Sequence, residues 1–244
     1  MTIVYIISAP SGSGKSTLVN ELRKSVRNLD FSVSYTTRSA RGSEQNGHEY
    51  FFISRPEFER LLAQDAFLEH AEVFPGKYYG TAKRFLEGAR ERGHDLLLDI
   101  DVQGERQVKG KIPDAVSIFI LPPNRKELER RLRRRSQAEG MSSEEDIHRR
   151  LETARKEIEN YGNYDYILVN DQLEQSIDEL KAIVLAERVR RSGGPRSPEQ
   201  EKWLVTAERH KQANIRKTLE PILESFALSA IPGGIRLNER EVTR

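Results

Sequence analysis

The sequence predicts a doubly wound α/β fold built on a parallel sheet. Short, nearly continuous apolar segments alternate with helical stretches, and the first apolar segment leads into a glycine-rich loop and then a helix. Unbroken apolar runs are typical of parallel strands that helices cover on both faces. We expect strands at residues 3–8, 95–100, 116–121 and 166–169. In such folds ligands bind at the carboxyl ends of the strands.

The loop after the first strand, APSGSGKST at residues 9–17, has the composition of a phosphate-binding loop. Gly12 and Gly14 allow the backbone to curl, so that successive amide N–H groups point at phosphate oxygens. The positive end of the following helix adds to this field. Lys15 can then reach the outer phosphates of a nucleoside triphosphate, and the Ser16 hydroxyl can bind Mg²⁺.

Composition excludes several other classes of protein. Of the 244 residues, 32% are charged and 36% are hydrophobic, and no run of about 18 apolar residues could span a membrane. The chain has no cysteine, which excludes disulfides, thiolate metal sites and a cysteine nucleophile. No basic region precedes the first apolar run, so we expect no secretory signal and a cytoplasmic location.

Two segments are predicted to be inserted into the core. Residues 31–82 are rich in aromatic residues, arginines and turn formers, and residues 125–150 are dense in arginine and predict a helical lid. A residue that can cap a helix, followed three positions later by Glu, marks helix starts at Ser54, Asn124 and Ser142. The arginines of this segment repel one another unless an anion binds between them. Instead of a lid, the same cluster could form a solvated helix face or a nucleic-acid patch.

Residues 186–244 are predicted to form a linker and a helical extension. SGGPRSP at 192–198 is a linker by composition, and apolar residues follow at helical spacing, with Pro221 expected to kink or interrupt the run. The segment carries 12 Lys and Arg against 8 Asp and Glu. A basic segment of this kind is more often a solvated helix than a contact for nucleic acid. A dimerisation helix or a regulatory flap are also open, and the oligomeric state cannot be inferred. We expect removal of residues 192–244 to leave the chemistry working.

Residues 32–52, SVSYTTRSARGSEQNGHEYFF, carry two arginines three positions apart and then a tyrosine, a set suited to gripping a second phosphate. This string resembles the substrate-binding segment of guanylate kinases. SAPSGSGKST, LLLDIDVQG at 96–104 and YILVND at 166–171 resemble the same family in the same order, over about residues 2–185.

The resemblance implies an enzyme that transfers the γ-phosphoryl group of ATP to GMP or dGMP, with Mg²⁺ as cofactor and no membrane or nucleic-acid partner. It implies a kinase domain at residues 1–185, with a GMP-binding insert at 31–82 and a lid at 125–150. The residues implied for ATP are Ala9, Pro10, Ser11, Gly12, Ser13, Gly14, Lys15, Ser16, Thr17 and Asn170. Those implied for GMP are Ser34, Arg38, Arg41, Tyr50, Glu69, Tyr79, Thr81, Asp99 and Asp101. The implied catalytic residues are Lys15, Arg131, Arg135 and Arg150, and the implied metal-associated residues are Ser16 and Asp99. Ala9 replaces the first glycine of the usual loop pattern and is small enough to be tolerated.

Glu69 has a chemical reason to select guanine. Guanine presents N1–H and N2–H₂ as adjacent donors, and one carboxylate can accept both; adenine presents an acceptor at N1 and would leave that charge unpaired. Without the resemblance, a helix over residues 67–71 with Glu69 in solvent is the favoured interpretation. Asp99 and Asp101 could each serve the metal, the base or a structural hydrogen bond.

Two other functions compete with this one. Another nucleoside-monophosphate kinase, acting on AMP, UMP or dTMP, is disfavoured by Ser34, Glu69 and Thr81 together. A non-catalytic scaffold domain of the same fold lacks phosphate-loop residues, whereas Lys15 and Ser16 are present here.

Overall fold

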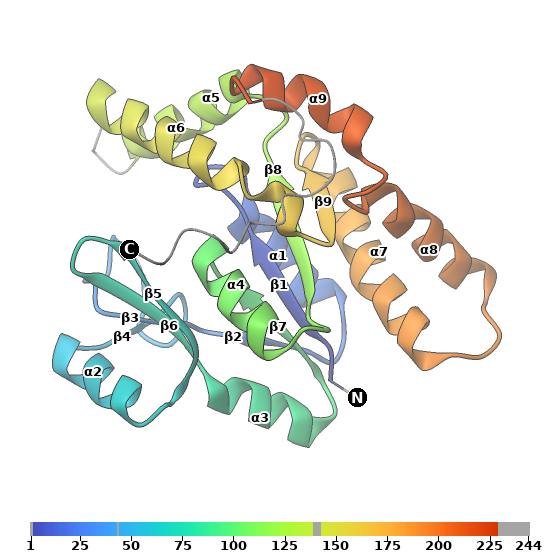
Figure 1. Cartoon of the computed structure of the whole chain (residues 1–244), viewed down its shortest axis with the longest axis horizontal. Coiled ribbons are helices and arrows are strands. Elements are labelled where there is room, and N and C mark those ends of the chain that lie inside the picture. The colour runs from blue at the N-terminus through green and yellow to red at the C-terminus, as the bar shows by residue number, and fades with distance from the viewer. Residues whose placement is uncertain (1, 43, 139–142, 229–244) are drawn as a thin grey trace, which may run out of the picture.

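The computed structural model describes residues 2–42, 44–138 and 143–228. Its core is a five-stranded parallel sheet in the order β2-β7-β1-β8-β9 (Figure 1). The strands are β1 (Val4–Ser8), β2 (Leu29–Ser32), β7 (Asp95–Asp99), β8 (Val116–Leu121) and β9 (Tyr166–Val169). The four predicted strands are all present. β2 was not predicted, because its sequence LDFS is half polar and three of its four residues are only half-buried at the sheet edge.

Helices cover both faces of this sheet, which confirms the doubly wound fold. Tyr5 and Ile7 of β1 pack with α1 (Lys15–Ser25) and α7 (Leu173–Ser192). Val4 and Ile6 point the other way and pack with α3 (Lys83–Arg92) and α4 (Val102–Lys111). Because alternate residues of a strand face opposite sides, β1 must be apolar throughout. β1 pairs with β7 on one side and β8 on the other, so the loop after β1 lies where the chain direction across the sheet reverses.

The insert forms a second, four-stranded sheet in the order β4-β3-β6-β5. Its elements are β3 (Tyr35–Thr36), β4 (Phe51–Phe52), α2 (Arg55–Ala63), β5 (Phe67–Phe74) and β6 (Lys77–Ala82). The helical alternative for residues 67–71 is therefore wrong. Those residues pair with β6 in antiparallel register, Glu69 opposite Thr81, and this pairing decides the conformation.

The predicted lid, residues 125–150, corresponds to α5 (Arg125–Ala138) and the first part of α6 (Glu144–Ile158), which are called the lid helices below. Two of the predicted helix caps are present: Ser54 Oγ accepts from the Glu57 amide at 3.3 Å, and Asn124 Oδ1 accepts from the Glu127 amide at 2.8 Å. The cap of α6 is Ser143, whose Oγ accepts from the Asp146 amide at 3.0 Å. The predicted cap, Ser142, lies outside the described residues.

The described part of the C-terminal segment, up to residue 228, packs on the rest of the chain. α7 continues to residue 192, α8 (Pro198–His210) lies beside α7, and α9 (Arg216–Ser225) lies beside α5 (Figure 1). Leu219 and Leu223 of α9 are buried in one cluster with the lid side chains Leu132 and Leu151. The helical run breaks before α9, and Pro221 lies inside that helix rather than interrupting it. Helices α8 and α9 are thus part of the folded body and not a solvated appendage.

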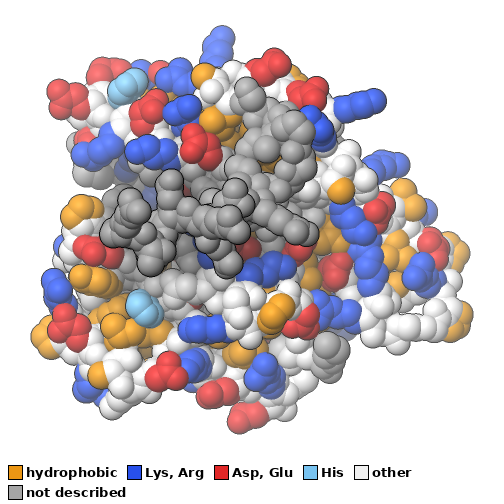
Figure 2. Space-filling view, in the orientation of Figure 1, with side chains coloured by type: hydrophobic (Ala, Val, Ile, Leu, Met, Phe, Trp, Pro, Cys, Tyr) orange, Lys and Arg blue, Asp and Glu red, His pale blue; other side chains and the backbone are white. Residues whose placement is uncertain are grey.

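The surface shows no segregation of charge on the face drawn in Figure 2, where basic and acidic side chains are interspersed. Among the described residues, no helix is both long and apolar enough to cross a membrane.

Candidate active site

The phosphate loop joins β1 to α1 at the carboxyl end of the sheet. Gly12 and Gly14 both adopt positive φ, 91° and 89°, which side-chain-bearing residues rarely do. A Cβ at Gly14 would collide with the Asn170 side chain. Ala9, in place of the first glycine, packs against the core. The Pro10 carbonyl accepts from the Ser13 amide at 3.1 Å and closes the turn.

Lys15 forms an ion pair with Asp99 across the end of the sheet. Asp99 is the last residue of β7 and sits opposite Ile7 in the register with β1. Burial by itself would lower the pKa of Lys15, but the Asp99 carboxylate outweighs it and the pKa is raised. In this structure Asp99 therefore holds the loop lysine in its charged form.

The predicted metal-associated residues adjoin this pair. Ser16 and Thr17 are exposed in the first turn of α1, next to Lys15. Among the described residues, no cluster of three or more His, Asp or Glu could hold a metal by itself. Mg²⁺ in nucleotide enzymes commonly takes only one or two protein oxygens, together with phosphates and waters. A hydroxyl from Ser16 and a carboxylate from Asp99 fit that donor set.

Arg38 is the buried cation of the insert, with 8% of its surface exposed. Its guanidinium donates to both carboxylate oxygens of Glu44, at 2.6 and 2.7 Å, and lies 4.9 Å from the centre of the Tyr50 ring. Tyr79 meets Tyr50 edge to face, with ring centres 5.8 Å apart. Arg41 is exposed, and its amide donates to the same Glu44 carboxylate at 2.8 Å. The structure thus brings together four residues predicted to hold the GMP phosphate.

Glu69 is buried, with 3% of its surface exposed, on β5. Burial raises the pKa of its carboxyl to about 7, against an opposing effect of Thr81 on β6. The Thr81 hydroxyl is buried and has no hydrogen-bond partner of good geometry among the described residues. Gly104 leaves room for the Glu69 carboxyl, because a Cβ there would lie 2.7 Å from Oε2. Ser34 is half-buried in the same insert, and its carbonyl accepts from the Phe51 amide at 2.9 Å.

Asp101 has a structural role in this conformation. Its Oδ1 caps α4 by accepting from the amides of Gln103 at 3.1 Å and Gly104 at 2.8 Å. The Asp101 charge also contributes to the raised pKa of Glu69. This cap is the structural hydrogen bond that the sequence left open as one role of Asp101.

On the side predicted to bind ATP, Arg131 and Asn170 converge on one carbonyl of the phosphate loop. The Ser13 carbonyl accepts from Asn170 Nδ2 at 2.7 Å and from Arg131 Nη1 at 3.4 Å. Arg131 Nη2 donates to the Asn170 carbonyl at 3.0 Å. Of the other predicted lid arginines, Arg135 is exposed on α5, and Arg150 donates to Ser136 Oγ at 3.4 Å.

The guanylate kinase family model matches residues 1–187. A guanylate kinase from Koribacter versatilis (strain Ellin345) is 59% identical over 223 residues, which cover 91% of this chain and 95% of that protein. The chain belongs to the guanylate kinase family.

Other members of the guanylate kinase family agree with this assignment. The guanylate kinase of Escherichia coli (strain K12) is 48% identical over 191 residues, 78% of this chain and 90% of that protein. The crystal structure of guanylate kinase from Anaplasma phagocytophilum superposes with a TM-score of 0.63 at 36% identity, covering 77% of this chain and 87% of that chain. The Koribacter alignment is longer than the matched family region, so it extends into the C-terminal segment.

Two carboxylates of the site were not predicted. Glu44 orients Arg38, and Glu127 accepts from Arg131 Nε at 2.8 Å. The spacing of Glu127 and Arg131, four positions apart on a helix, is a signal that sequence reasoning could have used. Glu44 lies in a turn-rich segment without helical periodicity, and no comparable spacing rule applies to it.

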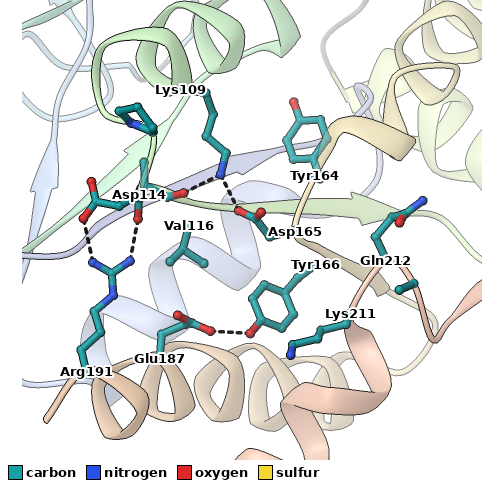
Figure 3. A pocket seen from close by; sticks show the side chains of 13 residues that line it. Lys109, Asp114, Val116, Tyr164, Asp165, Tyr166, Glu187, Arg191, Lys211 and Gln212 are labelled. Atoms are coloured by element: carbon teal, nitrogen blue, oxygen red, sulfur yellow. Dashed lines mark hydrogen bonds and ion pairs between the residues drawn. The ribbon is translucent and has the colours of Figure 1, made fainter. Parts of the chain in front are cut away.

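A separate cavity of about 460 Å³ lies at the opposite end of the sheet, near the first residues of β8 and β9, Val116 and Tyr166 (Figure 3). Lys109 contacts Asp165 at 2.8 Å across its wall, and Arg191 contacts Asp114 at 3.1 Å. The cavity is thus distinct from the nucleotide site, which is at the carboxyl ends of the strands.

Proposed function

We propose that this chain transfers the γ-phosphoryl group of ATP to GMP, giving ADP and GDP. The observation that carries the proposal is the pairing of two sites: a phosphate loop whose lysine is held by Asp99, and an insert that buries Arg38 and Glu69. One site suits a triphosphate and the other suits a phosphate joined to a base with adjacent donors.

The ATP side would act through the loop amides and Lys15. Amide N–H groups at the start of α1 bind the phosphates, and Lys15 exchanges part of its contact with Asp99 for the outer phosphates. Mg²⁺, bound by Ser16 and Asp99 together with the phosphates, would neutralise charge on the transferred group. Arg131 lies close to Ser13 of this loop and can add a further positive charge.

The GMP side would hold the acceptor in place. The Arg38 fork suits the phosphate, with the hydroxyls of Tyr50 and Tyr79 as further donors. Glu69 would accept from guanine N1–H and N2–H₂, and this contact favours the ionised carboxylate. A phosphate oxygen of GMP then attacks the γ-phosphorus of ATP, and the bond from that phosphorus to the ADP oxygen breaks. No general base is needed, because the attacking oxygen is already an anion.

Specificity for the base follows from the burial of Glu69. An ionised carboxylate with 3% exposure loses its solvation, so a base that offers an acceptor leaves it unpaired at a large cost. The proposal also includes dGMP as a second acceptor substrate. It further places the enzyme in the cytoplasm.

An assay of ADP release with ATP and Mg²⁺, run separately with GMP, AMP, UMP and dTMP, tests the proposal. GMP should support turnover far better than the other three monophosphates. A preference for another monophosphate, or ADP release that does not depend on any monophosphate, would overturn it.

A further inference from the structure

Helix α4 lies beside β5, the strand of the insert that carries Glu69 (Figure 1). β5 is at the edge of its sheet and pairs only with β6, so its outer edge has no neighbouring strand. Backbone N–H and C=O groups on such an edge need other partners. Here α4, which belongs to the core and not to the insert, supplies them.

A glutamine of α4 takes the place of the missing strand at His70, the residue after Glu69. Gln107 Oε1 accepts from the His70 amide at 3.2 Å, and Gln107 Nε2 donates to the His70 carbonyl at 2.6 Å. One side-chain amide thus satisfies both backbone groups of His70, as a residue of a paired strand would. Two hydrogen bonds to one residue fix its orientation as well as its position.

Two further residues of α4 contact β5 at and before Glu69. Lys111 Nζ donates to the Leu68 carbonyl at 2.6 Å. Gly104 adjoins the Glu69 side chain, because a Cβ there would lie 2.7 Å from Oε2 and 3.1 Å from Cδ. Together with Gln107, these residues recur at the three- and four-residue spacing of one helix face. Helix α4 therefore holds both chain neighbours of Glu69 and limits where its carboxyl can lie.

The same helix is tied to the phosphate loop through the core sheet. It follows β7, whose last residue, Asp99, forms the ion pair with Lys15. The contacts of α4 with β5 thus fix the Glu69 carboxyl relative to the loop on which the triphosphate would bind. A recognition group needs to be held within about 0.5 Å of its productive position, and supporting residues of a rigid element provide this.

We propose that α4 is a specificity element for the base: through Gln107 and Gly104 it places the Glu69 carboxylate so that it accepts from guanine N2–H₂ as well as from N1–H. This inference rests on the function proposed above. Gln107 and Gly104 are positioning residues that act through Glu69. GMP and inosine monophosphate (IMP) differ only in the 2-amino group, so misplacement of the carboxylate should weaken GMP binding more than IMP binding.

The first test is Gln107→Met, which keeps the length of the side chain and removes both hydrogen bonds to His70. The matched control is Gln64→Met, the same change at an exposed glutamine of the insert. Calorimetric titrations with GMP, IMP and ATP, each alone, give three dissociation constants. The wild type should prefer GMP over IMP, and Gln107→Met should reduce this preference roughly tenfold while the ATP constant stays within about twofold. Gln64→Met should match the wild type.

The second test, Gly104→Ala, displaces the Glu69 carboxyl directly. The closest atoms that the new methyl group would meet are at the end of a side chain, which can move aside. Ala is also a better helix former than Gly, so we expect the variant to fold. It should lose the preference for GMP over IMP to a similar extent and keep its affinity for ATP.

Thermal unfolding identifies the variants that are folded. A folded Gln107→Met protein with the wild-type preference for GMP over IMP would overturn the inference. Equal weakening of GMP and IMP would also overturn it, since that is the effect of a contact that only docks the insert on the core. If Gln107→Met does not fold, Gly104→Ala decides by the same two criteria. The titrations need no phosphoryl transfer, so they can fail separately from the proposed function, which fails if the wild type forms no ADP in response to GMP.

Discussion

Arg38 donates to both oxygens of Glu44, and this bidentate ion pair is mostly buried in the insert. The contact raises the pKa of Arg38 further above its ordinary value and lowers the pKa of Glu44. The fork is thus oriented before any phosphate arrives, and orientation of a substrate-binding group is a main source of rate in phosphoryl transfer.

Replacement of Glu44 by Gln should release this orientation. We expect the KM for GMP to rise roughly tenfold, because a charge-assisted contact that fixes Arg38 is lost. The KM for ATP should not change. The control is Glu59→Gln, a change of an exposed glutamate on α2. An unaltered KM for GMP in Glu44→Gln would show that Arg38 needs no orienting partner.

The affinity for GMP should depend on the ionisation of Glu69. Burial raises the pKa of this carboxyl to about 7, and guanine needs the ionised form. The KM for GMP should therefore fall as the pH rises through about 7 and level off above it. The GMP phosphate also titrates, with a pKa near 6, so the comparison is made with Glu69→Gln. That variant should have a much higher KM for GMP, an ordinary affinity for ATP and no step near pH 7; a persisting step would assign it to another group.

Glu105 should make the stability of the fold depend on pH. It is buried on α4, and burial raises its pKa to about 7. Between the unfolded value of about 4.5 and 7 the folded state binds more protons, so the free energy of unfolding falls as the pH rises across this window. Glu105→Gln removes this dependence, and its effect should be about 1–2 kcal/mol more stabilising at pH 8 than at pH 5. Urea unfolding of both proteins at the two pH values measures this; equal effects at both would contradict it.

Helix α9 should stabilise the lid. Leu223 is fully buried among lid side chains, so Leu223→Ala should lower the free energy of unfolding by about 2–5 kcal/mol. Glu220→Ala changes an exposed residue of the same helix and should have little effect. The packing also leads us to expect that removal of residues 192–244 destabilises the lid; the expectation from sequence concerned only the chemistry. A Leu223→Ala variant as stable as the wild type would show that α9 is only loosely attached.

Much of the fold was readable from sequence because its signals are local. The apolar runs at β1, β7, β8 and β9 predict buried strands, and the glycines at 12 and 14 have the positive φ that the loop needs. The features that were missed depend on partners distant in sequence. β2 is a strand because it pairs with β7, and residues 67–71 form a strand because they pair with β6.

The candidate site shows the same difference between local signals and partners that are distant in sequence. Lys15, Arg38 and Glu69 could be predicted by residue type and by resemblance. Their ionisation and orientation could not, because these depend on Asp99, Glu44 and burial in the folded chain. The role of Asp101 could not be decided from sequence either. It lies in a matched motif, and only the folded chain shows that its carboxylate caps α4.

In the proposed reaction, the γ-phosphoryl group of ATP passes directly to GMP at the phosphate loop. The most direct measurement follows γ-labelled ATP incubated with GMP, Mg²⁺ and either the wild type or Lys15→Ala. The label should appear in the β-phosphoryl group of GDP with the wild type, and not with a Lys15→Ala variant that unfolds at the same temperature. Label released as inorganic phosphate without labelled GDP, or labelled GDP formed equally well by Lys15→Ala, would contradict the claim.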